Sequence, residues 1–80
     1  MNQRELKQAR RLLCAALRQS REDAGLTQAD LGQRLGVGQS YVSKIENGDR
    51  KLEVSELVII CRALEIDAVK FIKALIEQQK

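Results

Sequence analysis

Apolar residues recur at every third or fourth position through most of this chain, and glycines separate the segments that carry the pattern. Such spacing places the apolar side chains on one face of an α-helix. The absence of proline and the scarcity of β-branched runs also favour helix. We therefore predict an all-α, compact fold of five helices, over residues 3–24, 28–35 and 39–46, from near 53–55 to 64, and over 67–78.

The apolar faces supply the predicted core. The inward-facing residues of the first, third and fourth helices are Leu6, Ala9, Leu13, Ala16, Leu17, Ala24, Val42, Ile45, Leu57, Ile60, Cys61 and Leu64. The fifth helix has one apolar side made of Val69, Ile72, Leu75 and Ile76, and Phe71 has to complete the core. A small domain cannot bury all four, so we expect the remainder to form a self-complementary dimer patch. In the alternative, the long first helix packs across the fourth and fifth helices and covers that side.

The helix ends are marked by capping residues and by glycines. Gly25 ends the first helix, and Thr27 with Asp30 forms a capping box that begins the second. The second and third helices are joined by a turn of about three residues, 36–38, and Asn47-Gly48 closes the third. Two short helices joined by a tight glycine-containing turn have the geometry of a helix-turn-helix, here over about residues 28–47.

Composition narrows the class of protein. The 80 residues include 14 Lys+Arg and 11 Asp+Glu, for a net charge of +3, and no histidine. A single domain of this size over residues 1–80 leaves little interior for a substrate cavity. Without histidine, most general-base and zinc chemistries lack an essential group. We therefore expect a binding module that has no catalytic residues, no metal site and no cofactor.

The chain also lacks the signals of membrane insertion and export. No run of eighteen apolar residues occurs, and the N-terminal stretch is polar and basic, unlike a signal peptide. We expect a cytoplasmic protein. Cys14 and Cys61 lie singly in apolar helical patterns, so we interpret both as buried, reduced and structural.

The third helix carries the most informative polar residues. Its positions outside the core are Gln39, Ser40, Ser43 and Lys44, with no acid among them. Glutamine can pair with adenine, serine with several base edges, and lysine with guanine or phosphate. Positive charge is also concentrated toward the N-terminus, where residues 1–26 contain six basic and three acidic groups. Both features fit a protein that meets double-stranded DNA through the major groove, and the alternative for both is an ordinary solvated surface.

The segment from Gly25 to Gly48 closely resembles one family. Its sequence is GLTQADLGQRLGVGQSYVSKIENG, and it resembles the phage-repressor and Cro helix-turn-helix family, also called xenobiotic-response-element-like regulators. The resemblance covers roughly residues 17–71. It implies a five-helix, lambda-repressor-like DNA-binding domain that acts as a homodimer on a short palindromic operator.

The resemblance also implies roles for individual residues. Gln28 would bond a phosphate and brace Gln39, the first of the residues that contact bases. The other predicted DNA contacts are Ser40, Ser43 and Lys44 on the bases and Tyr41, Asn47, Arg50 and Lys51 on the backbone. In an alternative interpretation, Tyr41 only covers the edge of the core. Arg21 and Glu46 match a partly buried ion pair.

Three positions depart from the family pattern. Gly32 stands where an alanine is usual at the crossing of the two short helices, which permits close approach but weakens the helix by up to about 1 kcal/mol. Gly38 replaces the usual serine or threonine cap of the third helix. Glu65 stands where a glycine often ends the fourth helix.

The sequence thus predicts a cytoplasmic, nucleoid-associated bacterial transcription regulator, either a repressor or an autoregulatory controller. Its expected partners are operator DNA and a second copy of the chain, with RNA polymerase or another protein as a further partner, and neither a membrane nor a small-molecule ligand. The alternative is an antitoxin-like or adaptor module that uses the same fold as a scaffold for protein binding. The basic residues Arg4, Lys7, Arg10 and Arg11 are interpreted as solvated surface, with DNA contact as the alternative.

Overall fold

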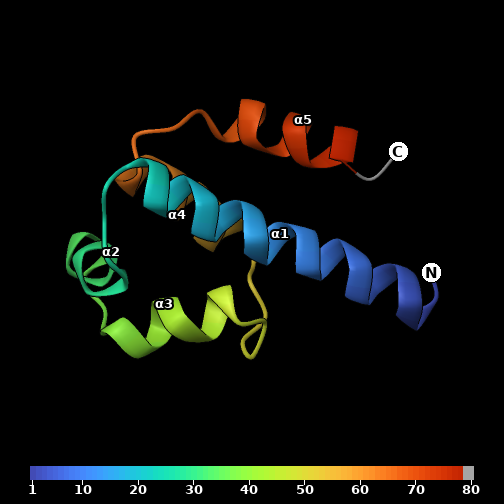
Figure 1. Ribbon diagram of the computed structural model, residues 1–80, viewed down its shortest axis with the longest axis horizontal. Coiled ribbons are helices and arrows are strands. Elements are labelled where there is room, and N and C mark those ends of the chain that lie inside the picture. The colour runs from blue at the N-terminus through green and yellow to red at the C-terminus, as the bar shows by residue number, and fades with distance from the viewer. Residues whose placement is uncertain (79–80) are drawn as a thin grey trace.

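The computed structural model describes residues 1–78 of the chain, and five helices account for most of them (Figure 1). The helices are α1 (Gln3–Asp23), α2 (Gln28–Leu35), α3 (Gln39–Glu46), α4 (Val54–Ala63) and α5 (Ala68–Gln78). No strand occurs among residues 1–78. The all-α prediction is confirmed, and each helix lies within one or two residues of its predicted bounds.

The long helix α1 organises the arrangement. It runs along the longest dimension of the molecule, which measures 35 × 24 × 20 Å. In Figure 1, α5 lies on one side of α1 and α3 on the other, while α2 lies near the end of α1 that leads into it. Contacts join α1 to α3 and α5, α2 to α3 and α4, and α4 to α5. The helix-turn-helix therefore rests on both α1 and α4.

One hydrophobic core joins α1, α2, α3 and α4. Its buried members are Leu17, Leu31, Val42, Ile45, Leu57, Ile60, Cys61 and Leu64. All the residues predicted to face inward from α3 and α4 are among them. The N-terminal part of the α1 stripe is only half-buried at Leu6 and Leu13, and Ala24 is exposed because the helix has ended there.

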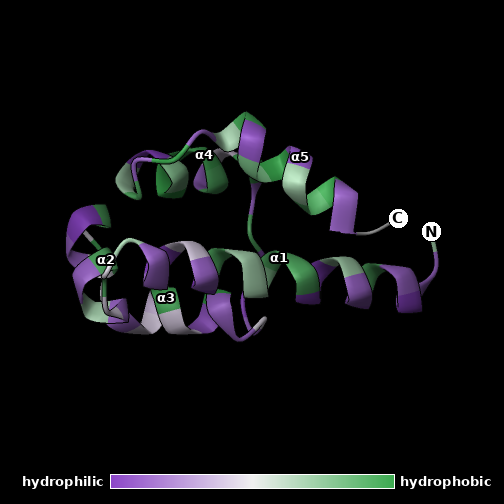
Figure 2. Ribbon diagram, turned by 45° about the horizontal axis from the view of Figure 1, so that its top comes forward, coloured by the Kyte–Doolittle hydropathy of each residue, from purple (hydrophilic) through white to green (hydrophobic). Residues whose placement is uncertain are grey.

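The prediction of one apolar side on α5 is wrong in one respect. Phe71 packs against the core, and Leu75 turns toward a hollow beside α1. Val69, Ile72 and Ile76 remain exposed, by 75%, 37% and 56% respectively. Helix α1 therefore covers part of the predicted patch and leaves a narrower exposed stripe of Val69, Ile72 and Ile76. Figure 2 shows that hydrophobic positions recur along α5.

The two cysteines differ in their surroundings. Cys61 is buried in the core, whereas Cys14 is only half-buried, so the prediction of full burial is wrong for Cys14. The Cys14 thiol donates a hydrogen bond to the Ile45 carbonyl at 3.2 Å. Burial raises the pKa of both thiols. Both are therefore free, protonated thiols near neutral pH.

Helix α4 ends on an unusual residue. The Ile66 and Glu65 amides donate to the Cys61 and Arg62 carbonyls, which is the bonding of a Schellman motif. This motif needs a residue in the left-handed backbone conformation, and Glu65 adopts that conformation with φ of 58°. The other left-handed residues at helix ends are the glycines Gly25, Gly36 and Gly48. A residue other than glycine costs about 1 kcal/mol in this backbone conformation, so Glu65 is strained where the family often has a glycine.

Gly32 lets the turn of the helix-turn-helix close tightly. The Val37 amide donates to the Gly32 carbonyl at 2.9 Å. A Cβ atom on Gly32 would lie 2.9 Å from the Val37 carbonyl oxygen and 3.2 Å from Gly38. Since these neighbours are backbone atoms, an alanine could fit only if the turn moved.

We predict that Gly32→Ala lowers the free energy of unfolding by about 1 kcal/mol, because the clash with the turn exceeds the gain in helix propensity. Urea denaturation measures the change. Gly38→Ser is the matched control, because open space surrounds Gly38 and a serine hydroxyl would cap α3 for a gain of a few tenths of a kcal/mol. A more stable Gly32→Ala protein would contradict this account of the turn.

Candidate nucleic-acid interface

A buried ion pair fixes α3 against α1. The Arg21 Nε and Nη2 atoms donate to the Glu46 carboxylate at 2.6 and 3.0 Å, and both side chains are buried. Arg21 Nη1 also donates to the Leu26 carbonyl at 2.7 Å, which ties the pair to the segment before α2. The prediction of this ion pair is confirmed.

The charges of this pair are stabilised by one another. The hydrogen bond to Glu46 raises the pKa of Arg21. Burial alone would raise the pKa of Glu46, but hydrogen bonds from Arg21 and Gln28 and the nearby Arg18 charge outweigh it and lower that pKa. Glu46 is therefore ionised at neutral pH despite its burial.

We predict that Arg21→Met lowers the free energy of unfolding by about 3–5 kcal/mol, because it leaves the Glu46 charge buried without a partner. Arg18→Met is the control on the same helix. Arg18 lies 3.7 Å from Glu46 with a side chain 55% exposed, so its loss should cost less than about 1 kcal/mol. Chemical denaturation distinguishes the two, and equal losses would show that the buried pair does not hold the fold together.

Glu46 also leads to the first predicted base contact. Gln28 Nε2 donates to Glu46 Oε1 at 3.1 Å, and Gln39 Nε2 donates to Gln28 Oε1 at 3.5 Å. These contacts form a chain from the core through the first turn of α2 to the first turn of α3. The structure therefore brings Gln28 and Gln39 together in the arrangement that the resemblance implies.

The outward side of α3 carries the remaining predicted base contacts. Gln39, Ser40 and Lys44 are exposed, and Ser43 is half-buried. Asn47, directly after the helix, donates from Nδ2 to Ser43 Oγ at a long 3.4 Å. The opposite side of α3 buries Val42 and Ile45, and Gly38 provides no side-chain cap. The eight-residue helix thus has one apolar face in the core and one polar, acid-free face in solvent.

Tyr41 and Arg50 lie in a separate cluster with Glu56. The Tyr41 hydroxyl donates to Glu56 Oε2 at 2.6 Å, and Arg50 Nη1 donates to the same oxygen at 2.6 Å. The Arg50 guanidinium stacks on the Tyr41 ring at 4.7 Å from its centroid. Tyr41 therefore touches the core with its ring while its hydroxyl holds the acid that positions Arg50.

The cluster holds its protons in a defined arrangement. Burial and the hydrogen bond to Glu56 raise the pKa of Tyr41 to about 12. The bond from Tyr41, followed by those from the Glu53 amide and Arg50, lowers the pKa of Glu56 to about 2. Glu56 consequently remains an acceptor for Tyr41 and Arg50 throughout the physiological pH range.

Sequence analysis missed Glu56. It lies in the first turn of α4, where it accepts a hydrogen bond from the Glu53 amide at 2.9 Å. The spacing of Glu53 and Glu56 matches the acidic residue at the third position of a helix start, which was the available signal. The approach of that turn to Tyr41 is a tertiary contact that no local pattern shows.

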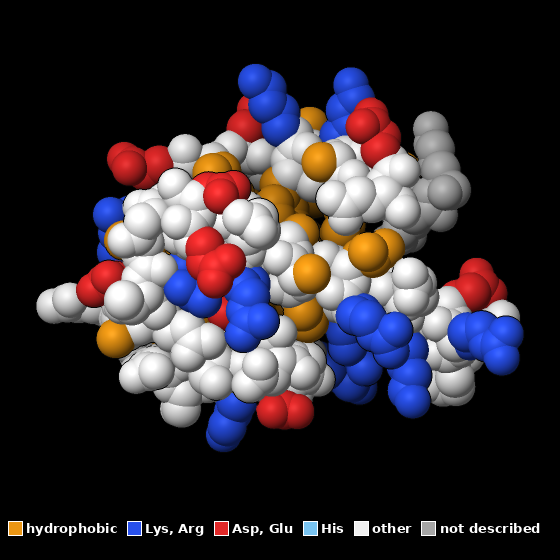
Figure 3. Space-filling view, in the orientation of Figure 1, with side chains coloured by type: hydrophobic (Ala, Val, Ile, Leu, Met, Phe, Trp, Pro, Cys, Tyr) orange, Lys and Arg blue, Asp and Glu red, His pale blue; other side chains and the backbone are white. Residues whose placement is uncertain are grey.

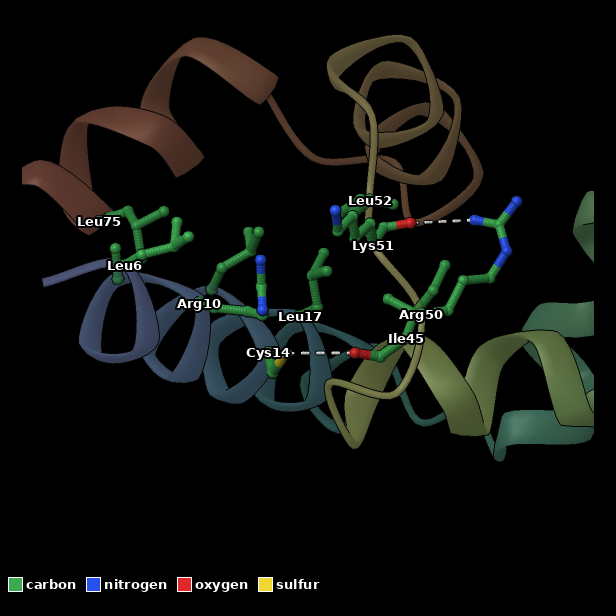
Figure 4. A pocket seen from close by; sticks show the side chains of 11 residues that line it. Leu6, Arg10, Cys14, Leu17, Ile45, Arg50, Lys51, Leu52 and Leu75 are labelled. Carbon is green, nitrogen blue, oxygen red and sulfur yellow. Dashed lines mark hydrogen bonds between the residues drawn. The ribbon is translucent and has the colours of Figure 1, made fainter. Parts of the chain in front are cut away.

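The loop after α3 is held from the side of α1 as well. Figure 4 shows Arg50, Lys51 and Leu52 on one wall of a cavity of about 360 Å³, with Leu6, Cys14 and Leu17 of α1 opposite and Leu75 of α5 at its end. The bond from Cys14 to the Ile45 carbonyl closes one side. The end of α3 and the loop that carries Asn47 and Arg50 are therefore positioned by α1.

The candidate interface thus consists of amides, hydroxyls, an ammonium and a guanidinium. Residues 1–78 contain no cluster of three or more potential metal ligands among His, Cys, Asp and Glu. None of the helices formed by these residues is both long and apolar enough to span a bilayer. The groups that do gather on α3 and the loop after it are hydrogen-bonding groups and the cations Lys44 and Arg50, which suit base edges and phosphates.

Geometry of this kind defines a helix-turn-helix domain, and comparison with known proteins places it in a family. The helix-turn-helix family model matches residues 17–71. A similar solved structure is the XRE-family-like protein from Pseudomonas syringae, with 35% identity and a TM-score of 0.86 over 92% of this chain and 90% of that one. The wild-type restriction-modification controller protein C.Esp1396I has 29% identity and a TM-score of 0.79, over 86% and 90%.

The chain belongs to the phage-repressor and Cro-type helix-turn-helix family, a family of DNA-binding transcriptional regulators and not of enzymes. A curated relative is the HTH-type transcriptional regulator PrpR of Mycobacterium tuberculosis, which is 35% identical over 57 residues. That match covers 71% of this chain and only 12% of the relative. The chain therefore corresponds to a small part of that longer protein.

Proposed function

We propose that this protein binds a specific operator by placing α3 in the major groove of double-stranded DNA. The observation that carries the proposal is the polar face of α3, where Gln39, Ser40 and Lys44 are exposed and no acid occurs. Folding does not require this selection, because the contacts that anchor the helix are made by Val42, Ile45 and Glu46 on its buried side. A rigid helix with free hydrogen-bonding groups matches the pattern of donors and acceptors that each base pair presents.

The neighbouring contacts support separate roles at this surface, with some residues contacting bases and others bonding phosphates. Gln39 is oriented by Gln28, so its amide is available for bidentate pairing with adenine. Gln28, Asn47 and Arg50 surround α3 and are proposed to bond phosphates, which position the protein without specifying sequence. Tyr41 acts through Glu56 to hold Arg50, since its own hydroxyl is already bonded.

A second copy of the chain is the proposed occupant of the exposed apolar stripe on α5. Val69, Ile72 and Ile76 lie three and four residues apart, so they form one continuous strip. A two-fold symmetric contact would bury the strip of one copy against the same strip of the other copy. Two copies then present two α3 helices to two half-sites, which accounts for a palindromic operator.

We infer regulation by promoter occupancy, with the bound dimer excluding or recruiting RNA polymerase on the nucleoid in the cytoplasm. The likeness to a restriction-modification controller supports an autoregulatory controller among such regulators. In this proposal α3 faces the DNA and the stripe on α5 joins the two copies. A change in protein concentration therefore suffices to change occupancy, because dimerisation and DNA binding are linked.

We predict that the double variant Gln39→Ala/Ser43→Ala loses sequence discrimination by about tenfold to a hundredfold. A bidentate pair such as that of Gln39 with adenine contributes about 1–3 kcal/mol of preference, and the single hydroxyl of Ser43 contributes less. Titration of a duplex selected by the wild-type protein, beside a scrambled duplex, measures this ratio. Gln78→Ala on α5 is the control and should keep it. Unchanged discrimination in the double variant, with binding otherwise intact, would contradict the role of α3.

We predict that Ile76→Asp weakens self-association at least tenfold, because it places a charge in the proposed contact and removes an apolar side chain worth about 1.5–3 kcal/mol of burial. Ala74→Asp is the matched control, since it adds the same carboxylate on the other side of α5. Sedimentation equilibrium over a range of protein concentrations measures both. If the wild type is monomeric at high concentration, or the two variants behave alike, the stripe is not the dimer contact.

A further inference from the structure

The first part of α1 lies outside the segment that defines the family. Helix α1 begins at Gln3, whereas the family model begins at residue 17, so 14 residues of the helix precede it. At 1.5 Å per residue they extend α1 by roughly 21 Å. This extension contains four cations and a single acid, Glu5. Its charge therefore calls for an explanation beyond the helix-turn-helix itself.

The fold places most of these cations beside the end of α3. A groove of about 550 Å³ lies between the first part of α1 and the end of α3, and the basic residues that line it are Lys7, Arg10, Arg11 and Arg18. Asn47 and Gly48 line the same groove from the end of α3. Lys7, Arg11 and Arg18 recur at helical spacing and thus share one face of α1. Figure 3 shows a group of Lys and Arg side chains on this part of the surface.

The groove has no acid available to neutralise these charges. Glu46 is the one acidic residue in its lining, and its side chain is 1% exposed and engaged by Arg21. Among residues 1–78, Lys7, Arg10 and Arg11 form no ion pair, and Arg18 has only the long contact to Glu46. Like charges held this close repel one another, so a bound polyanion would relieve the repulsion.

We propose that this basic groove binds backbone phosphates of duplex DNA next to the bases contacted by α3. The inference rests on the proposed function and extends it, because Asn47 belongs both to the groove and to the α3 interface. In this arrangement one duplex lies against α3 and the groove together, since Asn47 and Gly48 line the groove at the end of α3. In this proposal Lys7, Arg10, Arg11 and Arg18 belong to the DNA-binding surface, which for the first three is the alternative to their interpretation as solvated surface.

The groove contributes affinity and salt dependence and leaves sequence preference to α3. Phosphate contacts carry no sequence information, and each one releases condensed counterions. The slope of log K against log salt therefore becomes steeper by about 0.9 for each phosphate that a cation neutralises. Base discrimination and salt slope are separate measurements, so the two parts of the interface can be tested independently.

The test is the double variant Lys7→Gln/Arg11→Gln, which removes two groove cations. Glutamine has nearly the helix propensity of lysine and arginine, so α1 should remain folded, and circular dichroism verifies this. Affinity for a selected duplex is measured from about 50 to 200 mM salt. We expect the slope to fall by up to about 1.8, with at least tenfold weaker binding at the lowest salt and an unchanged ratio between selected and scrambled duplexes.

Arg62→Gln on α4 is the control for net charge, because Arg62 is exposed and does not line the groove. The proposal is overturned if the salt slope of the double variant equals that of the wild type. It is also overturned if each charge removed from the groove lowers the slope by no more than the charge removed in Arg62→Gln. If the wild type selects no duplex at all, the proposed function fails. The same slopes measured on random-sequence duplex DNA then still decide whether the groove binds phosphates.

Discussion

The buried contact between Arg21 and Glu46 determines where α3 lies, and the interface depends on that position. The carboxylate of Glu46, the last residue of α3, accepts hydrogen bonds from Arg21 of α1 and from Gln28 in the first turn of α2. The Arg21 guanidinium reaches the backbone before α2 at Leu26. One hydrogen-bonded pair thus connects both helices of the helix-turn-helix to the helix beneath them. Because the pair is buried, water does not compete for its bonds, and the pair fixes the position of α3 against α1.

These contacts explain how so short a helix could contact DNA bases from a defined position. Two apolar residues of α3 enter the core, Gln28 orients Gln39 at its start, and the Cys14 thiol bonds the Ile45 carbonyl near its end. The side chains left in solvent are thereby presented at fixed positions, so little conformational entropy would be lost on binding. The cluster of Tyr41, Glu56 and Arg50 extends the same principle to the following loop.

Local sequence signals predicted the helices well, because apolar spacing, capping residues and glycines act within a few positions. The ion pair and the roles of Gln28 and Gln39 came from the family resemblance. Tertiary placement was the part that sequence did not show. Glu56 approaches Tyr41 only because α4 packs where it does, and Leu75 lines a hollow beside α1 and does not join the exposed stripe of α5. The groove cations looked like ordinary surface until the direction of α1 relative to α3 was known.

The most direct test of this account is selection of bound duplexes from a random DNA library by the purified protein, with the mass of the complex recorded in solution. The account predicts a symmetric enriched site, bound by two copies of the chain, with half-sites about 10 base pairs apart from centre to centre. Absence of any enriched sequence, or enrichment of an asymmetric site bound by a single copy, would contradict it.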